Sequence, residues 1–74
     1  MTGPYAAVLF PSVSATLRAE KVLKQAGLAV KVVPVPRHLS SDCGVCLRIA
    51  ANSTATATLA LEAARLQHDG IHNI

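Results

Sequence analysis

The chain has 74 residues, of which 51% are hydrophobic and 15% are charged, so it has room for one core and is too apolar to be a disordered polymer. We therefore expect a single domain over residues 1–74. Aromatic residues make up 3%, which argues against a nucleic-acid-binding surface built on base stacking, and the cations behind the net charge of +3 are spread along the chain.

The first half of the chain predicts a strand, a helix and a second strand. Residues 5–10 form an apolar run before a proline and predict a buried strand. Ser12 or Ser14 is expected to cap the helix, and Gly27 to end it. Residues 28–35 alternate in polarity and predict a strand, which Pro34 and Pro36 are expected to end because proline lacks the amide that a ladder requires. The helix is expected to bury one apolar stripe, made of Ala15, Ala19, Val22, Leu23 and Ala26.

The second half repeats this order of elements. Residues 36–42 are polar and turn-rich and predict a loop, and residues 44–50 predict a strand that places Val45, Leu47 and Ile49 on one face. A second helix is expected to begin at Asn52 or Ser53, to run to about Gln67 before Gly70, and to be followed by a strand over residues 71–74. Its apolar stripe is expected to be Ala55, Leu59, Ala63 and Leu66.

The order strand, helix, strand, strand, helix, strand predicts an α+β, ferredoxin-like fold. We expect a four-stranded antiparallel sheet in the spatial order 4-1-3-2, with both helices on one face. The other face is expected to present a mixed surface suited to a partner or to a second copy of the chain. That surface would comprise Lys31, Val33, Cys46 and Arg48.

The two cysteines carry the chemical information in this sequence. No stretch approaches the roughly 18 apolar residues of a membrane span, so we expect no membrane contact and a cytosolic protein with reduced thiols. In the expected topology Cys43 lies near residues 10–12, where the amides and dipole at the start of a helix favour an anion. Arg37 and His38 add positive charge, so we expect the pKa of the Cys43 thiol to be lowered, although an adjacent carboxylate opposes this.

Two other interpretations stay open. Cys43 and Cys46 have the C-x-x-C spacing and, with His38, could bind copper(I) or zinc. Either cysteine could instead be a small buried hydrophobe in a non-catalytic interaction domain that dimerises through its open sheet face. The sequence contains no Ser-His-Asp pattern, no paired carboxylates and no phosphate-binding glycine loop, so we do not expect an enzyme with independent turnover.

The run P-V-P-R-H-L-S-S-D-C-G over residues 34–44, with Phe10-Pro11-Ser12 and Leu47-Arg48, resembles a small bacterial family described as selenium/sulfur carrier-like. The resemblance extends over nearly the whole chain. It implies a carrier that holds a persulfide or perselenide, needs no bound cofactor, and exchanges its cargo with a protein donor and a protein acceptor.

The resemblance also implies roles for individual positions. Cys43 would accept the sulfur or selenium, and Gly44 would keep the thiol accessible. Cys46 departs from the family pattern, and is either a resolving thiol that releases the cargo or incidental. The pocket around the acceptor would be formed by Ser12, Arg37, Ser40 and Ser41.

Overall fold

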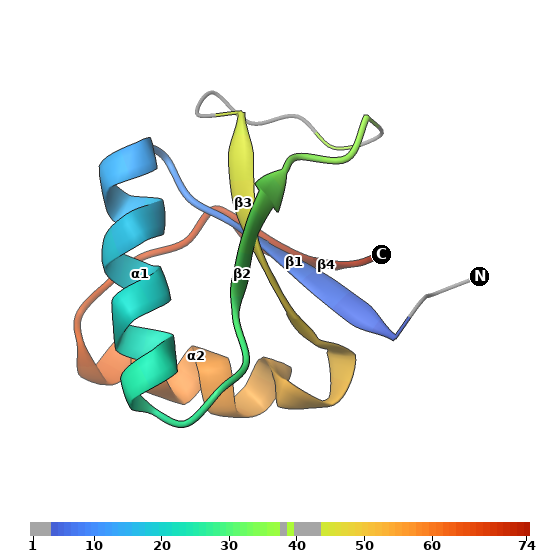
Figure 1. Ribbon diagram of the computed structural model, residues 1–74. Helices are drawn as coiled ribbons and strands as arrows, with labels where there is room; N and C mark the ends of the chain where they lie inside the picture. Colours follow the sequence, from blue (N-terminus) through green and yellow to red (C-terminus); the bar gives the residue numbers. More distant parts are fainter. Residues whose placement is uncertain (1–3, 38, 40–43) are drawn as a thin grey trace.

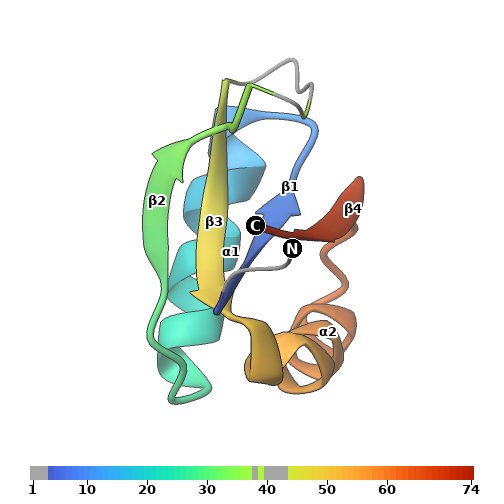
Figure 2. The ribbon, with the colours of Figure 1, turned by 90° about the vertical axis from the view of Figure 1, so that its right-hand side faces the viewer.

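The computed structural model describes residues 4–37, 39 and 44–74, which form an α+β arrangement of four antiparallel strands and two helices (Figures 1 and 2). Across the sheet the strands follow the order β2-β3-β1-β4, which is the expected order read from the other edge. In chain order the elements are β1 (Tyr5–Leu9), α1 (Val13–Gln25), β2 (Lys31–Pro34), β3 (Val45–Ala50), the 3₁₀ turn η1 (Ala51–Ser53), α2 (Thr54–Ala63) and β4 (Gly70–Asn73).

Strand β1 lies inside the sheet and pairs with two neighbours. Its register with β3 runs from Tyr5 opposite Ala50 to Val8 opposite Leu47. On its other side, its register with β4 runs from Ala6↔Asn73 to Leu9↔Gly70. Because neighbours cover both of its edges and both of its faces, β1 is buried from Ala6 to Leu9, as the sequence predicted, whereas Tyr5 at its start is exposed.

Both helices pack on one face of the sheet and share a single core. Buried side chains of α1 and α2 meet those of β1 and β3 there, and the prediction that both helices cover one face is confirmed. No helix within the described ranges is long and apolar enough to cross a bilayer. The buried members of this core are Ala6, Val8, Phe10, Ala19, Leu23, Leu47, Ile49, Ala57 and Leu61.

The predicted buried face of α2 was wrong within the helix, and of the expected stripe only Leu66, which follows the helix, packs against the core. Leu61 is 1% exposed and packs in the core with Ala57, whereas Leu59 is 67% exposed. Ala55 and Ala63, which were also assigned to the buried stripe, are exposed as well. Alanine and threonine fill most of this helix, so the hydrophobic pattern gives little contrast between its faces, and packing against α1 selects the face that is buried.

Helix α2 also ends earlier than predicted. It stops at Ala63 rather than near Gln67, and the residue with a left-handed backbone is Arg65, with φ of 58°, rather than a glycine. The amide of Leu66 donates to the carbonyl of Leu61 at 2.9 Å, which closes the helix end in a Schellman arrangement.

Strand β2 begins three residues later than predicted. Its pairing with β3 starts at Lys31, opposite Arg48. The preceding residues serve the helix instead, because the amide of Leu28 donates to the carbonyl of Leu23 at 3.1 Å and Val30 packs against the helical core. Residues 28–30 therefore lead from α1 to the sheet, and pairing with β3 begins only at Lys31.

The face of the sheet away from the helices carries a second, smaller cluster. Ala7, Leu9 and Cys46 are buried there, and we call this group the open-face cluster. The side chains packed over it are Val33, Val35, Leu39 and Ile74. The register confirms that Cys46 shares this face with Arg48, but the expectation that Cys46 contributes to a surface was wrong because these side chains cover it.

Candidate functional site

One end of the sheet brings together the segments that we expected from the sequence to lie near Cys43. The end of β2, the start of β3 and the first turn of α1 lie in the upper part of Figure 1, and the segment after β1 leads up to them, as Figure 2 also shows. The antiparallel registers require this arrangement, because Pro34 pairs with Val45 and Val8 pairs with Leu47. The predicted meeting of these segments is confirmed.

Ser12 caps α1 and fixes where the helix begins. Its backbone is extended, with φ of −150° and ψ of 161°, and its Oγ accepts a hydrogen bond from the amide of Ala15 at 3.1 Å. The Oγ1 of Thr16, which is buried, donates to the carbonyl of Ser12 at 2.9 Å. The amides of Val13 and Ser14 come first in the helix and have no acceptor within it, so their partial positive charge faces outward at this end of the sheet.

Gly44 holds the start of β3 in a conformation that suits glycine. Its φ is +73°, and no atom lies within 4 Å of the position that a Cβ would occupy. The constraint is therefore in the backbone and not in the space around it. The amide of Val35 donates to the carbonyl of Gly44 at 3.1 Å, so the β2–β3 ladder closes the base of the connection between these two residues.

Two described residues of that connection have definite surroundings. Arg37 is exposed, and its guanidinium forms no ion pair with a carboxylate of the described residues. Leu39 is half-buried and packs on the open-face cluster, and its amide donates to the carbonyl of Pro36 at 3.0 Å. Leu39 therefore packs on the face of the sheet where Cys46 is buried.

Several predicted site residues lie outside the described residues. Their roles in activation, in a pocket or in metal binding stay predictions. These residues are His38, Ser40, Ser41 and Cys43.

Cys46 is 0% exposed and belongs to the open-face cluster, between Ala7 and Leu9. A thiol in this position cannot meet a reagent, a metal ion or another thiol in solution unless its cover of Val33, Val35, Leu39 and Ile74 moves. Among the described residues no group of three His, Cys, Asp or Glu side chains is placed to hold a metal ion. Cys46 therefore has the surroundings of a buried hydrophobic side chain.

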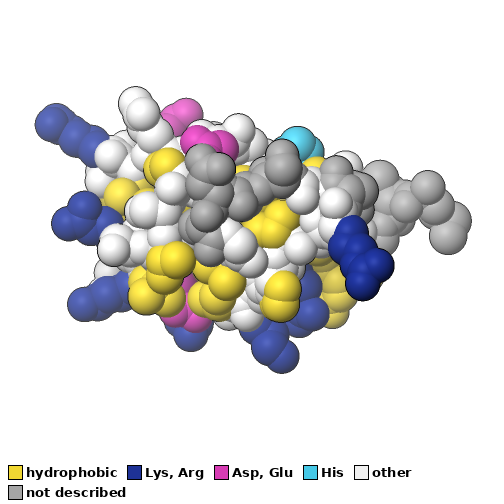
Figure 3. Space-filling view, turned by 90° about the horizontal axis from the view of Figure 1, so that it is seen from above, with side chains coloured by type: hydrophobic (Ala, Val, Ile, Leu, Met, Phe, Trp, Pro, Cys, Tyr) yellow, Lys and Arg dark blue, Asp and Glu magenta, His cyan; other side chains and the backbone are white. Residues whose placement is uncertain are grey.

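The surface at this end is basic at its margins. Figure 3 views the molecule from the top of Figure 1 and shows Lys and Arg side chains at the left, right and lower edges, Asp and Glu side chains along the upper edge, and hydrophobic side chains between them. A hollow of about 460 Å³ lies beside the start of α1 and is lined by Ser12, Ser14, Ala15, Arg18 and Leu66. Sequence reasoning did not single out Arg18 or the buried Thr16, although the spacing of Ser12 and Thr16 by one helical turn was a usable signal.

Comparison with known families gives one result. The model of the family described as "Putative Se/S carrier protein-like" matches residues 5–73, which span β1 to β4 and include the run that carried the resemblance. Searches among curated proteins and among solved structures found no significant match.

Proposed function

Since the chain belongs to the Se/S carrier protein-like family, we propose that it holds sulfur or selenium as a persulfide or perselenide on Cys43 and passes it to a protein acceptor in the cytosol. Cys43 is the nucleophile, and Gly44, with its exposed and left-handed backbone, leaves room beside it for a second protein. Ser12, Arg37, Ser40 and Ser41 are proposed to surround the acceptor sulfur.

The proposed transfer is a pair of thiol exchanges that require no redox cofactor. The Cys43 thiolate attacks the outer sulfur of a donor persulfide, a new S–S bond forms on Cys43, and the donor leaves as a thiolate. An acceptor thiolate then attacks the outer sulfur of the Cys43 persulfide, and the Cys43 thiolate leaves. The oxidation level of the moved sulfur is kept, and each released thiolate takes a proton from water or keeps its charge according to its pKa. A perselenide follows the same steps.

The observation that carries this proposal is that the start of β3 and the start of α1 lie at the same end of the sheet. Outward-facing amides at a helix start favour an anion, and a thiolate or persulfide is an anion at neutral pH. Arg37 adds a cation from the adjoining connection, and no carboxylate of the described residues pairs with it. These features support a site that stabilises the charged form of a sulfur group.

The burial of Cys46 supports a carrier with a single working thiol. Cys46 is buried in the open-face cluster with Ala7 and Leu9, so a thiol in solution cannot reach it while the cluster is closed. Release of the cargo is therefore assigned to attack by the acceptor's own thiol. Because Cys46 is buried, we also prefer the carrier to a metal-binding module that uses both cysteines.

The experiment that tests the proposal is intact mass spectrometry after incubation with a cysteine desulfurase and cysteine. The wild type and Cys46→Ala are expected to gain the mass of sulfur, which dithiothreitol removes, and Cys43→Ser is expected to gain none. Sulfur on Cys43→Ser, or no sulfur on any form while Cys43 is reduced and reactive to iodoacetamide, would contradict the proposal.

The fold class is also part of what we propose. We assign the domain to the ferredoxin-like class, and three features support the assignment: the order of its elements, the order of its strands, and the packing of both helices on one face. An experimental structure of the chain would test it.

A further inference from the structure

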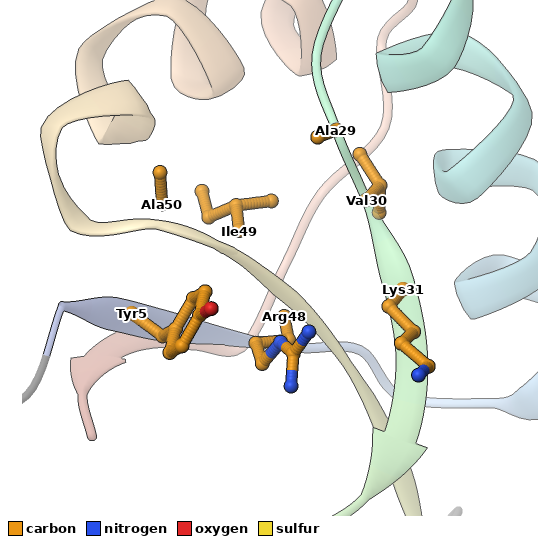
Figure 4. Close-up of a pocket in the computed structure, with 7 residues that line it drawn as sticks. All are labelled: Tyr5, Ala29, Val30, Lys31, Arg48, Ile49 and Ala50. Carbon is orange, nitrogen blue, oxygen red and sulfur yellow. The ribbon is translucent and has the colours of Figure 1, made fainter.

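A second pocket lies at the opposite end of the sheet from Gly44. It has a volume of about 230 Å³ and occupies the gap where the chain approaches β2 before pairing with β3. Figure 4 shows its lining side chains, which are Tyr5, Ala29, Val30, Lys31, Arg48, Ile49 and Ala50. The pocket exists because β2 starts at Lys31, three residues later than the sequence pattern predicts.

Arg48 is held in place by an aromatic ring. Its guanidinium carbon lies 4.3 Å from the centroid of the Tyr5 ring, and the two side chains lie side by side in Figure 4. A ring contact of this kind orients the guanidinium without occupying the N–H groups at its edge. Arg48 is therefore ordered in advance and still able to donate two parallel hydrogen bonds to a carboxylate.

Lys31 brings a second positive charge to the same place. It is the register partner of Arg48 on the neighbouring strand, and in Figure 4 both side chains project to the same side of the strands. Like charges directly opposite each other destabilise a sheet. The ion pair that the structure describes joins Glu20 to Lys24 at 3.3 Å on α1, and no carboxylate of the described residues neutralises Lys31 or Arg48.

The remaining walls of the pocket are apolar. Ala29 and Val30 form one side, and Ile49 and Ala50 form the other. An inorganic anion gains nothing from such walls, whereas an aliphatic group buried against them gains about 25 cal/mol for each Å² removed from water. The volume admits a group of a few carbon atoms and is smaller than a pocket for a drug-sized ligand.

We propose that this pocket binds a small organic carboxylate with a short aliphatic body. The carboxylate receives hydrogen bonds from the edge of the Arg48 guanidinium and the charge of Lys31, and the aliphatic body lies between Val30 and Ala50. Tyr5 is a positioning residue that acts through Arg48. Binding an anion here removes the repulsion between the two cations, which nothing else in the described part of the chain offsets.

The test is a titration of the full ¹⁵N-labelled chain followed by two-dimensional NMR, with isovalerate as the probe. Isovalerate is expected to shift the amides of residues 29–31 and 48–50 in a saturable way. Isovaleramide, which has the same shape without the charge, is expected to leave them in place, and inorganic phosphate is expected to bind at least about tenfold more weakly because it lacks the aliphatic body.

Variants distinguish binding in the pocket from nonspecific attraction to the positive charge of the chain. Arg48→Met is expected to weaken isovalerate binding at least about tenfold. Tyr5→Leu is expected to weaken it less, while Arg48→Lys recovers only part of the affinity because an ammonium lacks the two-pronged geometry. Lys21→Met removes an exposed cation of α1 that does not line the pocket, and binding is expected to be unchanged.

Three results would overturn the proposal. They are equal shifts with isovaleramide, equal weakening by Lys21→Met and Arg48→Met, and saturable binding of a peptide that ends in valine without binding of isovalerate. The last would assign the site to a polypeptide carboxylate instead. The wild-type spectrum serves as the folding control for every variant.

Discussion

Gly27 and Arg65 hold equivalent positions, one residue past the caps of α1 and α2, and both have positive φ, 88° and 58°. Each helix closes with the same pair of hydrogen bonds, and in α2 the amide of Leu66 donates to the carbonyl of Leu61. A left-handed backbone costs a residue with a Cβ roughly 1–2 kcal/mol, a cost that glycine does not carry. Helix α2 therefore ends with a strain that is absent from α1.

We expect Arg65→Gly to raise the free energy of unfolding by about 1 kcal/mol, because glycine adopts the left-handed backbone without strain. Gly27→Ala should lower it by about the same amount, since the space beside Gly27 is empty and only the backbone opposes the substitution. Urea denaturation measures both. Arg65→Ala is the control and should change little, and an equal gain from alanine would show that loss of the arginine side chain, not backbone strain, is responsible.

The two leucines of α2 allow a direct test of which face of this helix is buried. Leu61→Ala leaves a cavity in the core and should cost about 2–5 kcal/mol of unfolding free energy. Leu59→Ala removes the same atoms from a side chain that is 67% exposed and should change stability by less than about 0.5 kcal/mol. Thermal or urea unfolding of the two variants compares them. Similar losses from both would contradict the packing of α2 described above.

The cap of α1 has a similar control in Ser14, two residues after it. Ser12→Ala removes the acceptor for the amide of Ala15 and should cost about 1 kcal/mol of stability. Ser14→Ala, in the first turn and exposed, should be close to neutral. Helix content by circular dichroism and urea midpoints report the difference, and equal effects would show that the side chain of Ser12 does not cap the helix.

The thiol of Cys46 should be protected in the native protein. In Cys43→Ser, which leaves Cys46 as the remaining thiol, labelling by a thiol reagent should be much slower under native conditions than in urea, because the open-face cluster must open first. Timed quenching and intact mass follow the reaction. Native labelling as fast as that of an unfolded chain would place Cys46 at the surface.

The pH dependence of alkylation tests the activation of Cys43 directly. In Cys46→Ala the alkylation rate should rise with pH around an apparent pKa below about 8.5, the value of an unperturbed thiol. Loss of a nearby cation disfavours the thiolate, so Arg37→Gln should raise that pKa. Lys31→Gln, at the far end of β2, is the control and should not. An apparent pKa at or above about 8.5 in the parent would contradict activation.

The sequence predicted the order of the elements and the two faces of β3 correctly, but not the buried face of α2 or the bounds of α2 and β2. Alternation in residues 44–50 correctly placed Leu47 and Ile49 toward the helices and Cys46 away from them. Whether Cys46 is then covered depends on Leu39, which lies outside the alternating run, and on Ile74, which follows β4. No local pattern contains that information.

The same distinction explains why one candidate site could be predicted from the sequence and the other could not. Strand order alone brought the start of β3 to the start of α1, so this end of the sheet was predictable. The pocket beside Arg48 was not predictable. It depends on β2 starting three residues later than the pattern predicts, and on the contact between Arg48 and the ring of Tyr5 on another strand. The alternation of residues 28–35 continues through that gap without a change.

The position of β1 between β3 and β4 has a consequence for how the protein acquires its structure. Ala6–Leu9 is an apolar stretch whose second edge is satisfied only when Gly70–Asn73, the strand last in chain order, arrives beside it. Contacts so distant in sequence form slowly, because the entropy of closing the whole chain must be overcome first. Until then β1 is an open template for other extended chains. Refolding should therefore become less efficient as protein concentration rises, and a version of the chain without β4 should aggregate through β1.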